Sequence, residues 1–162
     1  MKTMFYAACL LLAATPALAT DFISMDINLN DLSDPVATMM DPGTIKPGPD
    51  GHRLATFLAI REENVYRERF MELDCSGARW RQLSSIWHDE SGKTTPGTPD
   101  DSWAAIKTGS VGAWEKEIVC SWPNTLQGAD IIQAGTVQDL VERASFVLGE
   151  MADRKIKEGQ KK

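Results

Sequence analysis

Two stretches of strand-forming residues flank the dipeptide Ser76-Gly77, and no other feature of the sequence constrains the fold as strongly. The stretches run from Tyr66 to Cys75 (YRERFMELDC) and from Arg79 to His88 (RWRQLSSIWH). Glycine and serine are favoured in tight turns, and two strands joined by a short turn usually pair with each other. The sequence therefore predicts an antiparallel β-hairpin over residues 66–88.

Pairing Cys75 with Ala78 gives this hairpin a register that can be tested. On one face, it sets four pairs of side chains opposite each other: Asp74 with Arg79, Glu72 with Arg81, Phe70 with Leu83, and Tyr66 with Trp87. Two pairs are ionic and two are apolar, and complementary cross-strand pairs stabilise a sheet by about 0.2–1 kcal/mol each. The opposite face then carries Cys75 together with Leu73, Met71, Trp80 and Ile86.

The first 19 residues have the pattern of a secretory signal. Lys2 is the only charged residue before Asp21, an apolar stretch covers Met4 to Ala14, and the segment ends in the small-x-small order at Ala19. The apolar stretch is shorter than the roughly 18 residues that a membrane span needs. We expect cleavage after Ala19, export through the secretory pathway to the periplasm or cell surface, and no membrane span afterwards. The alternative is a buried N-terminal helix.

The charge balance limits the partners. The chain has 162 residues, with 17 Lys and Arg against 23 Asp and Glu, and removal of the signal with Lys2 leaves 143 residues of net charge −7. Binding along a nucleic acid backbone requires a large basic surface. We therefore expect no nucleic acid partner.

The cysteines indicate an oxidised protein. Cleavage removes Cys9 and leaves Cys75 and Cys120. An even pair of cysteines in an exported chain favours a disulfide, and a loop of about 45 residues closed in this way contributes roughly 4 kcal/mol. The alternative is two separate buried thiols.

The remaining segments yield a coarse map. Residues 20–35 alternate Ile23, Met25, Ile27 and Leu29 with polar residues, which fits either a strand or a loose extended arm. Residues 36–40 and 53–61 are expected to be strands, 46–52 and 94–99 loops, and 100–106 a short helical turn.

Two longer helices are also expected. Ser110 is in position to cap a helix that ends at Cys120. Thr136 and Asp139 form a capping pattern ahead of an amphipathic helix that reaches about Lys157.

The hairpin also gathers arginines and tryptophans, namely Arg67, Arg69, Arg79, Arg81, Trp80 and Trp87. These residue types often anchor interfaces, so one interpretation is a surface that faces a ligand, with Trp80, Arg67 and Arg69 as its centre. The other interpretation is structural, because Glu72 and Asp74 neutralise two of the arginines across the strands. Phe146 lies off the apolar stripe of the last helix, where it is available to dock a second subunit or the N-terminal arm.

Residues suited to catalysis are sparse. The segment 108–112 (TGSVG) resembles a nucleophile elbow but lacks its first glycine, so Ser110 is interpreted as a helix cap. His52 lies in a Pro/Gly loop, and His88 precedes Asp89 and Glu90 at a turn. A surface metal site at either histidine, and with it a metal-dependent enzyme, is an alternative. The primary expectation is a protein without enzymatic activity, cofactor or metal.

Several of these segments together resemble the surface-adhesin protein E family of bacterial exported proteins. The resembling stretches are MDPGTI at 40–45, the strand at 53–60, ELDC at 72–75 followed by RWRQL at 79–83, WAAIKTGS at 103–110, and Val119-Cys120. The resemblance covers about residues 36–120, and Thr44 stands where the family tends to have Ser.

The resemblance implies a small antiparallel sheet packed with helices and a bond between Cys75 and Cys120. The founding adhesin of the family binds host extracellular-matrix and serum proteins and can dimerise. A protein partner in the envelope or the host is therefore implied here, and a homodimer is an alternative. No binding residue is carried over.

Taken together, these inferences predict an α+β fold in which a small antiparallel sheet packs against helices, with a long C-terminal amphipathic helix and one disulfide. The expected organisation is a signal peptide at 1–19, an arm at 20–35, an adhesin-E-like domain at 36–135, and a C-terminal helix with a polar tail at 136–162. The expected function is non-enzymatic protein–protein binding in the cell envelope. The runner-up is a periplasmic accessory protein that binds a small molecule or a chain partner in a groove between sheet and helix.

Overall fold

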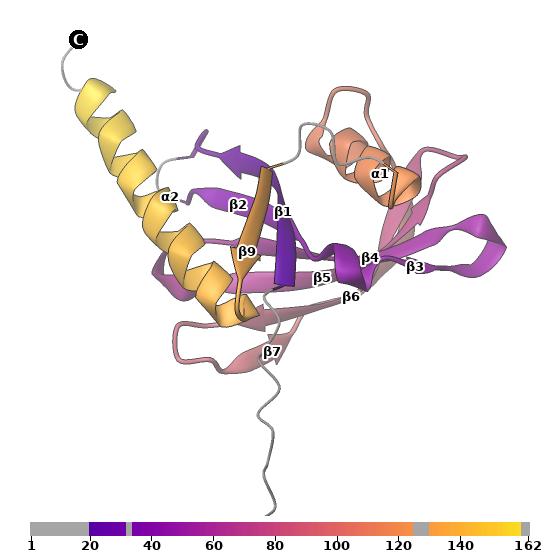
Figure 1. Cartoon of the computed structure of the whole chain (residues 1–162), viewed down its shortest axis with the longest axis horizontal. Coiled ribbons are helices and arrows are strands. Elements are labelled where there is room, and N and C mark those ends of the chain that lie inside the picture. Colours follow the sequence, from indigo (N-terminus) through magenta and orange to yellow (C-terminus); the bar gives the residue numbers. More distant parts are fainter. Residues whose placement is uncertain (1–19, 32–33, 125–129, 160–162) are drawn as a thin grey trace, which may run out of the picture.

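A computed structural model describes residues 20–31, 34–124 and 130–159, and within these ranges one antiparallel sheet dominates (Figure 1). The expected cleavage site at Ala19 lies outside the described residues. The strands are β1 (Thr20–Asn28), β2 (Val36–Met40), β3 (Lys46–Pro47), β4 (Arg53–Ile60), β5 (Tyr66–Asp74), β6 (Arg79–His88), β7 (Thr94–Pro96), β8 (Asp100–Ala105) and β9 (Asp130–Ala134). The helices are α1 (Val111–Ser121) and α2 (Val137–Gly159). The sheet follows the order β7-β6-β5-β4-β2-β1-β9, with β3 paired to β4 and β8 paired to β6.

The expected α+β class, with a small sheet packed against helices, is wrong. The described residues form a sheet of nine strands, and the two helices are additions to it. Four segments account for the difference. Residues 100–105 form β8 rather than a helical turn, and residues 94–96 form β7 rather than a loop. Residues 46–47, in the expected loop at 46–52, form β3, and β9 was not expected at all. The N-terminal segment, for which strand and arm were both open, is a strand that pairs with β2 and β9.

The hairpin of β5 and β6 is confirmed, and its register is half right. Asp74 pairs with Arg79 and Glu72 with Arg81, as expected. A β-bulge opposite Phe70 and Met71 then shifts the pairing by one residue, so that Phe70 meets Ser84 and Tyr66 meets His88. A bulge inserts one unpaired residue into a strand, and the shift moves Ile86 away from the face on which Leu73 and Met71 lie.

A second bulge occurs in β1, between Ser24 and Asp26. Without it, the alternating Ile23, Met25 and Ile27 would share one face of the sheet. With it, Ile23 and Met25 belong to the apolar cluster beside α1, whereas Ile27 lines a cleft beneath α2. Asp26 is consequently turned to the side of the sheet on which α1 lies.

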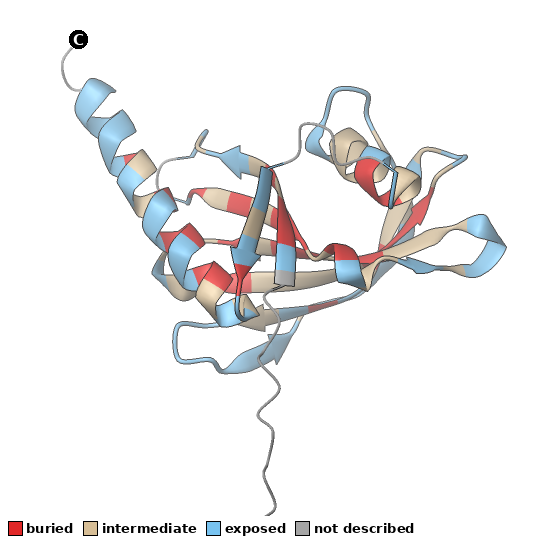
Figure 2. Cartoon of the chain, in the orientation of Figure 1, coloured by how far each residue is buried: buried red, intermediate tan, exposed pale blue. Residues whose placement is uncertain are grey.

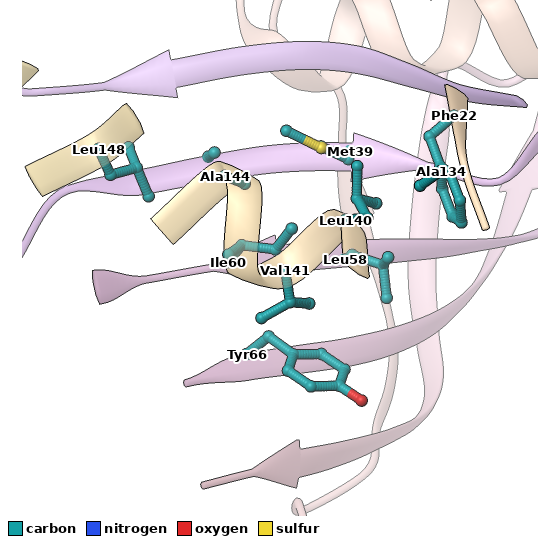
Figure 3. Packing of buried hydrophobic residues seen from close by; sticks show 11 residues of the cluster. Phe22, Met39, Leu58, Ile60, Tyr66, Ala134, Leu140, Val141, Ala144 and Leu148 are labelled. Atoms are coloured by element: carbon teal, nitrogen blue, oxygen red, sulfur yellow. The ribbon is translucent and has the colours of Figure 1, made fainter. Parts of the chain in front are cut away.

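Each helix covers part of one face of the sheet. Beneath α2, Leu140, Val141, Ala144 and Leu148 point toward the sheet, where they meet Phe22, Met39, Leu58, Ile60 and Tyr66 (Figure 3). Beneath α1, Ile118 and Val119 pack on Ile23, Met40, Phe57, Met71 and Leu73. Buried residues concentrate under the two helices, and the outer side of α2 is exposed (Figure 2).

Both helices begin at the expected caps. The Ser110 hydroxyl accepts a bond of 3.3 Å from the amide of Ala113, and the Thr136 hydroxyl accepts one of 3.1 Å from the amide of Asp139. The disulfide between Cys75 and Cys120 is confirmed, and it ties the end of β5 to α1 across a Cα–Cα distance of 5.7 Å. In the described ranges, neither helix combines the length and apolar character that a bilayer span requires.

Candidate functional site

The arginines and tryptophans of the hairpin do not form one surface. On the face beside α1 lie Arg67, Arg69, Trp80 and Trp87, in register with the buried Met71 and Leu73. On the opposite face, Arg79 and Arg81 contact acidic residues and the indole of Trp103. Successive side chains of a strand point to opposite faces, which separates the two groups. The structural interpretation therefore concerns Arg79 and Arg81, whereas the three hairpin residues of the expected interaction surface, Arg67, Arg69 and Trp80, lie on the other face.

The face beside α1 contains a hollow of about 460 Å³. Such a volume is typical of small-molecule sites. Its walls come from β1, β2, β5, β6, the end of β8 and the beginning of α1. The lining residues are Asp26, Asn28, Val36, Thr38, Arg69, Met71, Trp80, Ala105, Ile106, Lys107, Ser110, Val111, Gly112 and Glu115. This surface combines an indole and aliphatic groups with carboxylates, an amide, hydroxyls and two cations.

Arg69 lies at the floor of the hollow with part of its hydrogen-bonding capacity unused. Its Nη2 lies 3.4 Å from Oε1 of Glu115, and its guanidinium lies 5.9 Å from the ring centroid of Phe57. Its Nε is buried without a partner among the described residues. A buried donor without an acceptor carries a desolvation cost.

Arg67 lies two residues from Arg69 on the same face of β5, outside the lining of the hollow. Its Nη2 donates at 3.1 Å to both the Gln82 amide oxygen and the Ser85 hydroxyl, and its guanidinium lies 5.2 Å from the Trp87 ring centroid. Burial, followed by the neighbouring charges of Arg69 and Arg61, lowers the pKa of Arg67. Arg67 and Arg61 therefore add positive charge close to Arg69, which lines the hollow.

Glu115 and Asp26 supply the negative side of the hollow. The Glu115 side chain is 15% exposed, and burial raises its pKa, against the opposing effect of Arg69 and with a further contribution from the nearby charge of Asp26. Asp26 is half-buried and makes no hydrogen bond or ion pair with another described residue. A carboxylate in this state favours a cationic or hydrogen-bond-donating group.

The opposite face of the hairpin holds a buried charge network. Glu72 accepts from Nδ1 of His52 at 2.7 Å and from Nε of Arg81 at 2.8 Å. Burial alone would raise the pKa of Glu72, but the bonds from His52 and Arg81 outweigh it and lower the pKa. Trp103 also contacts this network, because the ring centroids of His52 and Trp103 lie 5.2 Å apart in an edge-to-face arrangement.

Asp74 belongs to the same network and lies beside the hairpin turn. It accepts from the Gly77 amide at 2.7 Å, from the Ser76 hydroxyl at 2.8 Å and from Nε of Arg79 at 2.9 Å. These bonds, the Gly77 amide first, hold the pKa of Asp74 far below its ordinary value. A side chain at position 77 would collide with the Asp74 carboxylate, which explains the glycine. The network stabilises the hairpin, in agreement with the structural interpretation of Arg79 and Arg81.

His88 lies at the end of the hairpin away from the turn, whereas His52 contacts Glu72 near the turn. Its ring stacks on Tyr66 with centroids 4.1 Å apart, and its Nε2 lies 3.0 Å from Oε1 of Glu68. Its position at a turn beside acids was the basis for the metal alternative. Across the described residues, no group of three or more His, Cys, Asp or Glu side chains could hold a metal ion.

Phe146 is 66% exposed on α2. It therefore lies neither in the hollow nor in the core. Of the four interaction residues proposed from the sequence, Trp80 and Arg69 line the hollow, Arg67 lies beside them, and Phe146 is separate.

Sequence reasoning missed the acidic side of the hollow. Asp26 lies in a segment whose regular alternation of apolar residues gives no indication of the bulge. Glu115 lies on a helix that was predicted from its apolar residues and its cap. A polar residue on the inner side of an amphipathic helix was the only available signal for Glu115. Comparison with protein-family models, curated proteins and solved structures gives no significant match for this chain.

Proposed function

We propose that this chain is an exported, non-enzymatic binding protein of surface-adhesin E type that holds its partner in the hollow beside α1. The observation that carries the proposal is the hollow itself, which is lined by Trp80, by Asp26 and by the ion pair of Arg69 and Glu115. A concave surface that combines apolar groups with a few polar and charged side chains is the means by which proteins orient a ligand.

The proposed export and envelope location have separate support. The bond between Cys75 and Cys120 is typical of proteins that fold in an oxidising compartment. Protease treatment of whole cells separates the two locations, because a surface protein is cleaved and a periplasmic protein is protected.

A second candidate function is that of a periplasmic protein that binds a small molecule in the same hollow. The volume of about 460 Å³ favours it, since it falls within the range of small-molecule sites. Mass spectrometry of the retained material distinguishes the two, because one yields a protein and the other a small molecule.

The experiment compares the purified protein with two variants. Thr38→Trp places an indole in the hollow, and Ser84→Trp places the same group at an exposed position of β6 that pairs with Phe70 on the other face. Each is immobilised and exposed in parallel to envelope extract and to extracellular-matrix proteins. We expect the wild type and Ser84→Trp to retain the same material and Thr38→Trp to lose it. Equal retention by all three folded proteins would refute the hollow as the binding site.

A further inference from the structure

Arg67 is the only arginine of the β5–β6 hairpin that forms no ion pair with a described residue. The other three, Arg69, Arg79 and Arg81, each lie within 3.4 Å of a carboxylate oxygen. Arg67 is nevertheless half-buried. Burial makes a charge expensive unless it is paired, so a counterion beside Arg67 is favourable.

The hydrogen bonds of Arg67 go to neutral groups. Its Nη2 donates to the amide oxygen of Gln82 and to the hydroxyl of Ser85, at 3.1 Å each. Its Nη1 donates to no described residue and, unlike Nε, is not buried. The neighbouring charges that act on it, those of Arg69 and Arg61, are both positive. Nη1 is therefore free to donate to a ligand, and the local charge favours an anionic one.

Arg69 presents a second free donor beside the first. Arg67 and Arg69 are two residues apart on β5, so their side chains leave the same face about 7 Å apart. Nη2 of Arg69 lies near Glu115, whereas its Nη1 is accessible and has no partner among the described residues. A carboxylate has two oxygens, each of which accepts an N–H bond at about 2.9 Å. One carboxylate is therefore large enough to accept from both guanidinium groups.

The hollow extends toward Arg67 over small side chains. Thr38 lines the hollow and pairs with Ala59, and Ala59 pairs with Arg67. Paired residues of neighbouring strands lie side by side on one face of a sheet. Thr38 and Ala59 are both only half-buried, so each keeps part of its surface in contact with solvent. A ligand in the hollow can therefore reach the guanidinium of Arg67 along this row.

The charges around the hollow suit a single negative charge. In its lining, the cations Arg69 and Lys107 are balanced by the carboxylates Asp26 and Glu115, and Arg67 adds one positive charge beside them. Asp26 does not neutralise Arg67, because β2 and β4 separate β1 from β5 and the two strands lie roughly 14 Å apart. A carboxylate supplies one negative charge, whereas a phosphate monoester at neutral pH supplies nearly two.

We propose that Arg67 and Arg69 bind a carboxylate of the partner protein at the edge of the hollow. The partner contributes the side chain of an aspartate or glutamate, which accepts from both guanidinium groups, and the adjoining part of the partner lies over Ala59 and Thr38. This inference rests on the proposed function and names the chemical group that the site recognises.

The test uses short blocked peptides as probes. The peptide acetyl-Ala-Glu-Ala-amide is titrated into the purified protein, and acetyl-Ala-Gln-Ala-amide is the control of equal shape without the charge. Binding is followed by the NMR signals of the side-chain Nε–H groups of Arg67 and Arg69. We expect the glutamate peptide to shift both signals saturably and the glutamine peptide to leave them unchanged. Equal shifts with the two peptides, or no shift with either, would overturn the proposal.

A third peptide with phosphoserine in place of the glutamate tests the class of anion. We expect it to bind no more tightly than the glutamate peptide, because its second charge has no counterpart in the site. An affinity about tenfold higher would overturn the proposal by assigning the site to phosphate groups.

Two arginine variants separate the site from the general charge of the protein. Arg67→Gln should weaken binding of the glutamate peptide about tenfold, the effect of one charge-assisted hydrogen bond. Arg53→Gln is the matched control, because Arg53 lies on the same face of the sheet, opposite Leu73, and its loss changes the net charge equally. The control should bind as the wild type does. Equal losses in the two variants would refute a specific site.

Glu115→Gln gives a readout that does not depend on the folding of an Arg67 variant. It removes the carboxylate that lies 3.4 Å from Arg69 and leaves that guanidinium available to the ligand. We expect this variant to bind the glutamate peptide severalfold more tightly than the wild type. An unchanged or lower affinity would contradict the participation of Arg69.

The two proposals fail in different ways. If Thr38→Trp abolishes retention of envelope material but the glutamate peptide does not bind, the hollow remains the binding site and carboxylate recognition is refuted. If Thr38→Trp leaves retention unchanged, the proposed function itself is refuted.

Discussion

Arg81 and Glu72 face each other across the β5–β6 hairpin, and both Nε and Nη2 of Arg81 approach the same carboxylate oxygen, Oε2, at 2.8 and 2.7 Å. The other oxygen of Glu72 accepts from His52 at 2.7 Å. Glu72 is only 1% exposed, so a buried charge is satisfied on both oxygens. Removal of one member of such a network leaves the others buried without partners.

The first prediction concerns Glu72→Gln. The glutamine keeps the shape of the side chain but loses the charge that Arg81 and His52 share, and we expect the free energy of unfolding to fall by about 3 kcal/mol. Urea denaturation measures it. Asp153→Asn is the control, because it removes an ion pair that is exposed to solvent. The side chains of Asp153 and Lys157 are 73% and 74% exposed, and Oδ2 of Asp153 lies 4.0 Å from Nζ of Lys157. That change should cost less than about 0.5 kcal/mol. Equal effects of the two substitutions would show that the network is not important for stability.

The second prediction concerns acid. Glu72 and Asp74 both have lowered pKa values in the folded protein. Their contribution to stability is therefore complete above their ordinary pKa values and is lost as the pH falls below about 4.5 toward the folded values. Asp74→Asn should be less stable than the wild type at neutral pH and should lose less stability on acidification, as measured by the urea midpoint against pH. Parallel curves for both proteins would contradict this.

The third prediction concerns Glu115, for which the sign is opposite. Because burial raises its pKa, the charged carboxylate opposes folding as the pH rises above about 4.5. Glu115→Gln should therefore be as stable as the wild type at neutral pH, or more stable, even though Arg69 loses an ion pair. Thermal unfolding at neutral and acidic pH measures this, and a clear loss of stability at neutral pH would show that the ion pair outweighs burial.

The fourth prediction concerns the disulfide. It closes a loop between residues 45 apart in sequence, and chain-entropy reasoning gives a contribution of roughly 4 kcal/mol. The double variant with Cys75→Ser and Cys120→Ser should lose most of that value, and the wild type under reducing conditions should match it. If the reduced wild type unfolds at the same urea concentration as the oxidised protein, the bond does not constrain the unfolded chain.

Local sequence patterns were sufficient for the hairpin turn, the first two cross-strand pairs and both helix caps, because the determining residues are close in sequence, as with Thr136 and Asp139. The disulfide followed instead from the even number of cysteines, Cys75 and Cys120, in a chain expected to be exported. The predicted class of fold was wrong in part because β8 forms through contacts with residues distant in sequence. Trp80 pairs with Ala104, and Trp103 lies between Arg79 and Arg81, so tertiary pairing overrides a short segment of weak preference.

The site was half predictable for a related reason. Trp80 and Arg69 were identified because arginine and tryptophan are rare and conspicuous on one hairpin. Asp26 was not, because a bulge decides which face it occupies, and a bulge changes the face of every residue beyond it. The separation of Arg79 and Arg81 from Arg67 and Arg69 followed from strand alternation and was available from the sequence.

The most direct test of the hollow as the binding site uses the five tryptophans as reporters. The NMR signals of the indole N–H groups are recorded while material eluted from the wild-type capture experiment is added to the purified protein. The signal of Trp80, which lines the hollow, should shift on addition, and that of Trp103, which lies in the charge network on the other face, should not. A shift of Trp103 with Trp80 unchanged would contradict the account and place the binding surface on the opposite side of the sheet.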